Sequence, residues 1–210
     1  MSQLSQQQIA QRLSDTLLDH QLTHIERADA AVLLGLQCRG DGFDVLLTRR
    51  ADHLKYHGGE VAFPGGRREK EDNSPKQTAL RETEEELGVA PETVEILGAM
   101  PTVTSRFGNL VVPYVGVIHP EQAFAPCPDE IADVFTVPVA HFLQDPRVRT
   151  DIFSRHDVEG EGVQKWAPVY HYQGFEIWGF TARILAEFLN TVYDVGITRE
   201  HISAPEKIWT

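Results

Sequence analysis

Three glutamates close together in the sequence have a spacing that would suit a divalent cation. Glu85 and Glu86 stand three and four positions after Glu82, so a helix would project all three from one face. Like charges in that arrangement destabilise an isolated helix by about 0.2–0.5 kcal/mol per facing pair. Mg²⁺ would compensate, because it accepts carboxylate oxygens and keeps several waters for substrate phosphates. The alternative is a solvated acidic face, which is the usual fate of a glutamate-rich helix.

The residues around the glutamates predict the helix that would carry them. Ser74 can cap its N-terminus, and Pro75 fits its first turn. Gln77 stands where a capping box has Glu or Gln, and Gly88 would end the helix. We expect the buried face to lie opposite the glutamates and to be formed by Ala79, Leu80, Thr83 and Leu87.

A glycine turn precedes this helix. Pro64, Gly65 and Gly66 predict a tight turn, and glycine lets a backbone approach a ligand closely. Such a turn would bring exposed carbonyls and amides next to the carboxylates. By itself it is equally consistent with an ordinary loop, so the metal hypothesis depends on the turn and the helix together.

The overall composition limits the kinds of partner. The chain has 210 residues, of which 31 are acidic and 19 basic, and its net charge is −12. This excess argues against a protein that coats nucleic acid, because such a protein needs a basic surface. It also repels an anionic substrate unless cations offset the charge locally. A site for a polyanion is therefore expected to be metal-assisted or ringed by Arg and Lys.

Cysteine usage and hydropathy predict a cytoplasmic protein. The two cysteines, Cys38 and Cys127, form no CxxC pair and suggest a reducing compartment. Residues 1–19 lack the apolar segment of a secretory signal. No apolar stretch approaches the roughly 20 residues that span a membrane.

Hydrophobic periodicity predicts a mixed sheet flanked by helices. Residues 5–20 have the pattern of an amphipathic helix, and residues 30–36 and 43–48 that of a β-hairpin. Strands are also expected in residues 93–103, 110–118 and 134–139, a hairpin in 169–177, and a helix in 181–192. Residues 144–164 are charged and contain two glycines, so we expect a loop or excursion there. Without an internal repeat or linker, one domain is the default.

The segment from Gly65 to Val89 resembles the Nudix box. The core of that box, Arg-Glu-x-x-Glu-Glu-x-Gly, is matched at every fixed position by the residues from Arg81 to Gly88. The general box has a glutamate eight residues before the arginine, where this chain has Asn73. The acidic residue is Asp72, one step earlier. That spacing resembles the coenzyme A pyrophosphatase-like subgroup.

A second signature, upstream of the box, resembles the same subgroup. It covers Leu46 to Arg50 and Leu54 to Gly66, and Ile177 to Ala182 resembles the subgroup's C-terminal element. The arginine that usually follows Leu54 is Lys55 here, which keeps the charge but loses bidentate geometry. The resemblance therefore extends over about residues 28–190, after a helical extension at residues 1–26.

The resemblance implies a fold and a reaction. The fold is α/β (α+β), a Nudix-like α/β/α sandwich with a mixed β-sheet flanked by helices, forming a single Nudix hydrolase domain over residues 1–210. The reaction is hydrolysis of a phosphoanhydride with Mg²⁺ or Mn²⁺, which neutralises developing charge and lowers the pKa of a bound water.

The resemblance also assigns roles to residues. Glu82, Glu85 and Glu86 would be metal ligands, although one of them could instead act as the base. The carbonyl of Gly66 would add a ligand, and Arg81 would orient the glutamates by ion pairing. Glu130, in a loop before a strand, is the candidate for a carboxylate recruited from outside the box. Its alternative is a first-turn glutamate that favours the dipole of a helix.

For coenzyme A, cleavage would give 3′,5′-ADP and 4′-phosphopantetheine. The 3′-phosphate demands cations, and arginine prefers bidentate phosphate contacts. The substrate-binding candidates come from the segment around the glycine turn and from a downstream loop: Arg49, Arg50, Lys55, His57, Arg67, Ser105 and Phe107. Each basic residue could instead be a solvated surface charge, and His57 could be a buried histidine bonded to backbone.

Other functions stay open at this point. A Nudix hydrolase for another nucleoside diphosphate derivative, such as ADP-ribose, would differ only in its pocket, and the signature from Leu46 to Gly66 argues against it. A Nudix-fold module that senses a nucleotide without turnover would be favoured by loss of a box glutamate, and none is lost. The expected partner is a small nucleotide such as coenzyme A, with no nucleic acid and no membrane. A homodimer is compatible with the sequence but not demanded by it.

Overall fold

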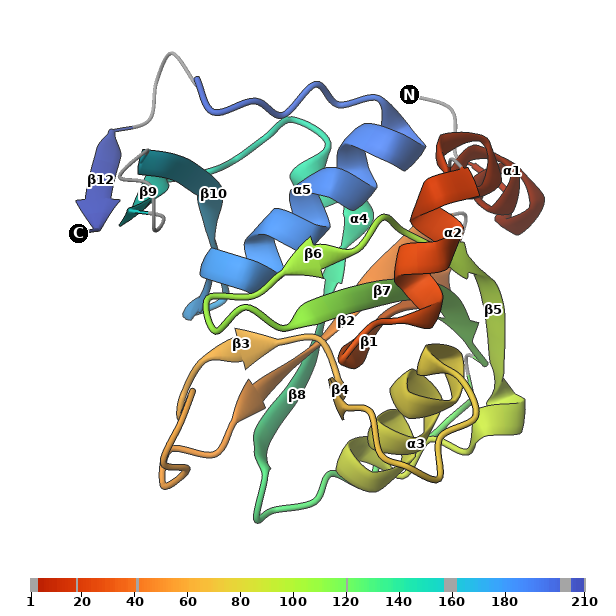
Figure 1. The fold of residues 1–210 in the computed structure, drawn as a ribbon. Helices are drawn as coiled ribbons and strands as arrows, with labels where there is room; N and C mark the ends of the chain where they lie inside the picture. Colours follow the sequence, from red (N-terminus) through yellow and green to blue (C-terminus); the bar gives the residue numbers. More distant parts are fainter. Residues whose placement is uncertain are drawn as a thin grey trace. The chain divides into compact units, whose positions relative to one another are not determined.

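The computed structural model describes residues 4–17, 19–40, 42–119, 121–156, 162–200 and 205–209. The chain folds as two compact units, residues 1–140 and residues 141–210 (Figure 1). Each unit has its own sheet. That the two form a single functional domain stays a prediction.

A mixed sheet forms the centre of the first unit. Strands β1 (Ala30–Arg39) and β2 (Gly42–Arg50) make the expected hairpin, and β1 also pairs in parallel with β7 (Leu110–Ile118). The main path of the sheet runs β3-β2-β1-β7-β5, with β4 on β1, β6 on β7 and β8 on β2. The remaining strands are β3 (Val61–Ala62), β4 (Gly65–Arg67), β5 (Val94–Ala99), β6 (Val103–Thr104) and β8 (Ile131–Pro138). The predicted α+β class, a mixed sheet flanked by helices, is confirmed.

The central strands are buried on both faces. Consecutive side chains of β1 point to opposite faces, yet Leu33 and Leu34 are both fully buried. Strand β7 is buried along nearly its whole length. Continuous apolar runs of this kind are typical of strands covered on both sides. This is why the runs at residues 30–36 and 110–118 lack polar alternation.

Two helices pack on one face of this sheet. Helix α3 (Pro75–Leu87) contributes Ala79 and Leu87 to the core, and α2 (Asp19–Glu26) contributes Ile25. These side chains join Leu33 of β1 in one cluster. A 3₁₀ turn at Pro91–Thr93 then leads into β5. The core thus fixes α3, the helix that carries the three glutamates, against the sheet.

The N-terminal segment differs from the single helix expected over residues 5–20. Helix α1 spans Gln6–Thr16, and a reciprocal capping box between Ser5 and Gln8 begins it. The next residue, Leu17, has an extended backbone and ends α1 before α2 begins. Ile9 and Leu13 are fully buried, so the amphipathic pattern was a valid signal for a helix but not for its length.

The second unit has a four-stranded sheet of order β11-β10-β9-β12. Its strands are β9 (Arg149–His156), β10 (Gly162–Tyr172), β11 (Phe175–Ile177) and β12 (Glu206–Trp209), and its long helix is α5 (Gly179–Tyr193). A short helix, α4 (Val139–Phe142), lies at the boundary of the units. The expected hairpin in residues 169–177 and the expected helix in 181–192 are both confirmed. Among the described residues, no helix is long and apolar enough to cross a membrane.

The expectation of a loop or excursion at residues 144–164 is wrong for most of its length. Strand β9 and the start of β10 occupy this segment and pair with each other. Its charged residues are compatible with a strand because Arg149 pairs with Asp151 at 2.8 Å and with Glu176 at 3.0 Å. Asp151 is fully buried as a result. Residues 157–161 of the segment lie outside the described residues.

Candidate active site

Both ends of α3 are stabilised by the local features that the sequence predicted. The Ser74 hydroxyl accepts a hydrogen bond from the Gln77 backbone N–H at 3.2 Å, and Pro75 stands in the first turn. Gly88 ends the helix in the left-handed conformation, with a φ of 67°. The predicted reciprocal bond of a capping box is absent, because the Gln77 side chain accepts instead from the Asn73 backbone N–H at 2.9 Å.

The three glutamates share the helix but not the same environment. Glu86 is only 3% exposed, whereas the side chains of Glu82 and Glu85 are 18% and 58% exposed. The expectation that all three lie opposite the buried face is therefore wrong for Glu86. Its carboxylate turns toward the sheet, where the Gly65 backbone N–H donates to it at 3.2 Å.

The tight turn expected at Pro64, Gly65 and Gly66 is instead the start of a short strand, and its two glycines make room for these carboxylates. Gly65 and Gly66 lie in β4, opposite Val32 and Ala31 of β1. Gly65 has a φ of 147°, and a Cβ added there would lie 2.6 Å from the Val32 Cα. A Cβ on Gly66 would overlap the carboxyl group of Glu82. Both positions therefore need glycine, the first for the backbone and the second for the carboxylate.

Arg81 is anchored by a buried aspartate. Its guanidinium donates to both carboxylate oxygens of Asp72 at 3.1 Å, and to Glu82 and Glu85 at 3.0 Å. The Arg81 bonds hold the pKa of Asp72 at about 2, and the carboxylates around Arg81 raise its own pKa. Asp72 is thus the acidic partner of Arg81. The general box has a glutamate one position later, where this chain has the exposed Asn73. This gives the shifted spacing a structural cause.

Burial dominates the electrostatics of the glutamates that face the sheet. Burial raises the pKa of Glu86 to about 7, and the Gly65 amide and Arg50 offset it only in part. The Arg50 guanidinium lies 3.4 Å from the Glu86 carboxylate, at the limit of a hydrogen bond. Burial also raises the pKa of Glu82, against the opposing effect of Arg81. A cation beside these carboxylates would restore their charged forms.

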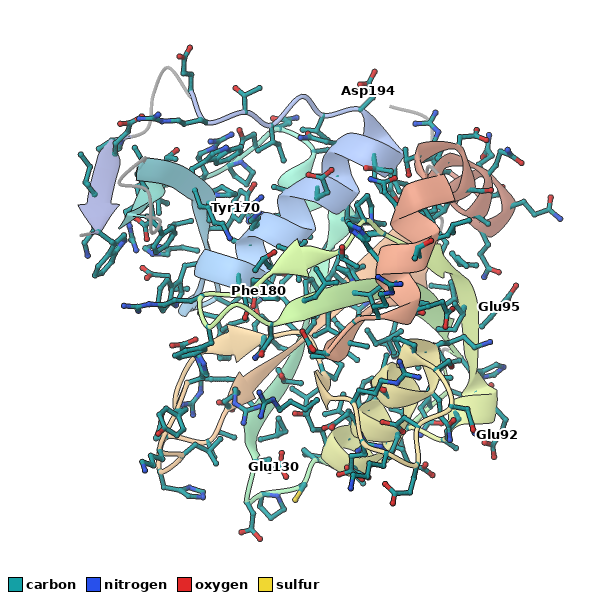
Figure 2. All side chains as sticks on the ribbon, in the orientation of Figure 1. Glu92, Glu95, Glu130, Tyr170, Phe180 and Asp194 are labelled. Carbon is teal, nitrogen blue, oxygen red and sulfur yellow. The ribbon has the colours of Figure 1, made fainter. Side chains whose placement is uncertain are left out.

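Glu130 comes to the same place from another element. It lies in the turn immediately before β8 (Figure 2), and its carbonyl accepts from the Ala51 N–H at 2.8 Å. Its negative charge contributes to the raised pKa values of both Glu82 and Glu86. Its exposed side chain is therefore near the box carboxylates, and it belongs to the turn before a strand rather than to the first turn of a helix.

The two arginines at the end of β2 have different partners. Arg49 donates to Asp133 at 2.6 Å and to Asp52 at 2.7 Å, and these bonds raise its pKa. Arg50 turns toward Glu86 instead. Of the two, Arg50 is the one placed beside the box carboxylates. Sequence reasoning missed the Asp133 pairing, because nothing local signals a partner on a different strand.

The other substrate-binding candidates lie on two loops and a strand. His57 contacts Glu60 at 2.9 Å, and its ring lies 6.0 Å from that of Phe107, edge to face. Phe107 is 68% exposed. The remaining candidates have contacts of their own: Arg67 lies 3.4 Å from the Asn109 side chain, the Ser105 hydroxyl accepts from the Asn109 N–H, and Lys55 lies over the Tyr56 ring. The structure thus brings His57 and Phe107 together, while Lys55 lies against the Tyr56 ring and has no ion pair with another described residue.

Comparison with known proteins identifies the family. The sequence matches the NUDIX domain over residues 26–156. The chain belongs to the Nudix family. The uncharacterized Nudix hydrolases NudL of Salmonella newport (strain SL254) and Salmonella agona (strain SL483) are each 39% identical to it over 174 residues, which are 81% of this chain and 87% of theirs.

Solved Nudix structures resemble parts of the chain. A MutT/nudix family protein from Enterococcus faecalis aligns over 89% of this chain and 73% of its own, with 19% identity and a TM-score of 0.48. The Nudix hydrolase RenU from M. smegmatis aligns over 55% of this chain and 73% of its own, with 24% identity and a TM-score of 0.46.

As a Nudix hydrolase, the protein acts on phosphoanhydride bonds of nucleotide diphosphate derivatives.

Nudix hydrolases generally use Mg²⁺ or Mn²⁺, and the residues of this site fit such an ion. Carboxylate oxygens are the donors that hard divalent cations prefer. Glu86 is buried with its charge only partly balanced, which a cation would correct. Within the described residues no three acidic, His or Cys side chains already converge as a metal-binding group. The glutamates are instead turned toward Arg81, Arg50 and the Gly65 amide.

Proposed function

We propose that this Nudix hydrolase cleaves the diphosphate bond of coenzyme A or its derivatives. The products would be 3′,5′-ADP and 4′-phosphopantetheine or its acyl form. One observation carries the proposal: the signature segment upstream of the box folds back onto the box. Arg50, in the first part of that signature, and Gly65, in the second part where the box begins, both contact the carboxylate of Glu86. Residues that resemble the coenzyme A subgroup thus meet the residue that resembles the catalytic core.

The proposed mechanism divides the work among four carboxylates. Glu82, Glu85 and Glu86, with the Gly66 carbonyl, would hold Mg²⁺ or Mn²⁺, which supplies charge neutralisation and a more acidic bound water. Glu130, in the turn before β8, would accept the proton of the attacking water. Its exposed carboxylate can reach solvent to release that proton.

Arginines and backbone would keep these groups in place. Arg81, fixed by Asp72, orients Glu82 and Glu85 through one guanidinium. The Gly65 N–H orients Glu86. Such preorganised contacts reduce the rearrangement needed when the substrate binds.

The cations and aromatic rings around the carboxylates suit the rest of coenzyme A. Arg50, whose guanidinium contacts Glu86, and Arg67, whose backbone carbonyl accepts from Arg81, would meet phosphates. Lys55 and Arg49 would add positive charge, while Arg49 also fixes the end of β2 through Asp133. The exposed ring of Phe107 offers a stacking surface for a base, and the Ser105, His57 and Asn109 contacts shape its surroundings.

The direct test incubates the purified protein with coenzyme A and Mg²⁺ and identifies the products by mass spectrometry. We expect 3′,5′-ADP and 4′-phosphopantetheine, and EDTA should abolish both. Turnover of ADP-ribose but not of coenzyme A would keep the Nudix reaction and reject the coenzyme A assignment. Metal binding without turnover of any diphosphate would favour a nucleotide-sensing module. Sedimentation of the same sample would show whether the protein forms a homodimer, which the sequence allows but does not demand.

A further inference from the structure

Arg81 and Arg50 neutralise the box carboxylates in different ways. Arg81 makes two bonds of 3.1 Å to Asp72 and a third to the Arg67 carbonyl, so its guanidinium is held in place by groups other than the box glutamates. Arg50 makes a single 3.4 Å contact, to Glu86. No other hydrogen bond or ion pair holds its guanidinium among the residues that the structure describes. One arginine is therefore part of the framework, and the other is only weakly held.

The backbone of Arg50 is fixed although its side chain is not. Its N–H donates to the Glu60 carbonyl at 3.0 Å, and its carbonyl accepts from the Gly59 N–H at 3.1 Å. The register of β2 against β8 shifts between Arg49 and Arg50, so the two neighbours are presented differently. The Arg50 side chain is 25% exposed and can move without leaving its anchored strand.

A divalent cation at Glu86 would meet the Arg50 guanidinium at the same carboxylate. Two positive charges a few ångströms apart in a partly buried site repel each other strongly. The carboxylate of Glu86 would then bind the ion, and Arg50 would need another anion. A diphosphate bound by the same ion supplies phosphate oxygens in the geometry that arginine prefers.

We propose that Arg50 is an exchangeable counter-ion of the metal site. It balances Glu86 in the free protein, competes there with the divalent cation, and moves to the diphosphate when metal and substrate bind. This inference rests on the proposed function only in requiring a divalent cation at the box and a diphosphate ligand. It predicts opposite effects of one substitution on two binding equilibria, which a purely structural role of Arg50 would not produce.

The test measures Mn²⁺ binding by electron paramagnetic resonance in the full-length protein without substrate. Arg50→Gln should bind Mn²⁺ about three- to tenfold more tightly than the wild type, since a partly exposed competing charge is removed. With Mn²⁺ present, methylenediphosphonate should bind Arg50→Gln about tenfold more weakly, because the arginine contact to phosphate is lost.

Arg39→Gln is the matched control. It removes the same charge from the same hairpin, but Arg39 lies at the far end of β1, pairs with Asp44 and has a side chain that is 76% exposed. Any change it causes measures the general effect of net charge. Arg50→Lys provides a second variant that keeps the charge and loses the planar fork. It should bind Mn²⁺ as the wild type does and bind the diphosphonate more weakly.

Two results would overturn the inference. One is Mn²⁺ affinity in Arg50→Gln no tighter than in Arg39→Gln; the other is equal tightening in Arg50→Lys and Arg50→Gln. Neither result depends on coenzyme A turnover. If Arg50→Gln tightens Mn²⁺ binding but the protein leaves coenzyme A intact, the counter-ion role stands and the proposed substrate is rejected. If the protein cleaves coenzyme A but Arg50→Gln does not tighten Mn²⁺ binding, the proposed substrate stands and the counter-ion role is rejected.

Discussion

Glu86 and Glu84 stand two positions apart on α3, yet their side chains lie in different environments. Glu86 is buried and faces the Gly65 amide, whereas Glu84 is exposed. Glu86→Gln should lower kcat/KM by at least about a hundredfold, the usual loss for a positioned catalytic group. Glu84→Gln changes the charge equally and should retain wild-type activity. Steady-state kinetics on both variants, with circular dichroism to verify folding, tests the assignment; comparable rates would place the site elsewhere.

A second prediction at the level of single residues concerns the contribution of Asp72 to stability. Its pKa is held at about 2, below its usual 3.8, so its contribution is complete above about pH 4 and is lost as pH falls toward 2. The shift corresponds to about 2.5 kcal/mol. Asp72→Asn should lower the free energy of unfolding at pH 6 by about 2–3 kcal/mol, because Arg81 loses its buried partner. Urea denaturation between pH 6 and pH 2 measures both effects.

A double variant supplies the control for Asp72. Asp72→Asn with Asn73→Glu returns the carboxylate to the position of the general box. It should not restore stability, since Asn73 is exposed and bound to Gln77 rather than to Arg81. Full recovery would mean that the anchoring of Arg81 does not depend on the buried position.

At the level of elements, the short strand β4 should respond differently to substitution at its two glycines. In Gly65→Ala the new Cβ would clash with the backbone of Val32, and the φ of 147° is unfavourable for alanine. The substitution should therefore lower the free energy of unfolding by about 2–5 kcal/mol. Gly66→Ala meets only the end of the Glu82 side chain, which can move. It should leave the melting temperature nearly unchanged while lowering activity. Gly108→Ala, at a positive φ with open space around it, should cost about 1 kcal/mol. Thermal melts and kinetics on the three variants distinguish these outcomes.

Local signals in the sequence predicted elements well and tertiary partners poorly. The cap at Ser74, the glycine at the end of α3 and the hairpin at residues 30–50 follow from short-range chemistry, and the structure contains them. The buried Glu86 is bonded to the amide of Gly65, 21 residues earlier in the chain, which periodicity cannot reveal. Strand β9 was missed because its Arg149 is paired with Asp151 in the same strand and with Glu176 on another strand. Asp72 was found only through the spacing of a family motif.

For the whole molecule, the net charge of −12 makes an uncompensated buried carboxylate costly. Without metal, the pKa of Glu86 is raised to about 7 from its usual 4.5, so the unfolded state loses that proton first as pH rises. Stability should therefore fall between about pH 5 and pH 7, by about 3 kcal/mol for this group. Glu86→Gln cannot ionise and should lack this decrease. Urea titrations in EDTA across that pH range would show it, with Glu84→Gln as the matched control.

Divalent metal should reverse the same pH dependence. A cation binds the ionised carboxylate, so binding releases a proton and becomes tighter as pH rises through about 7. At a concentration one hundred times its Kd, Mn²⁺ should add about 2.7 kcal/mol to the free energy of unfolding. The gain in melting temperature should then be larger at pH 8 than at pH 6, and small in Glu86→Gln at both. An equal gain at the two pH values in the wild type would mean that the ion binds carboxylates that are already charged, away from Glu86.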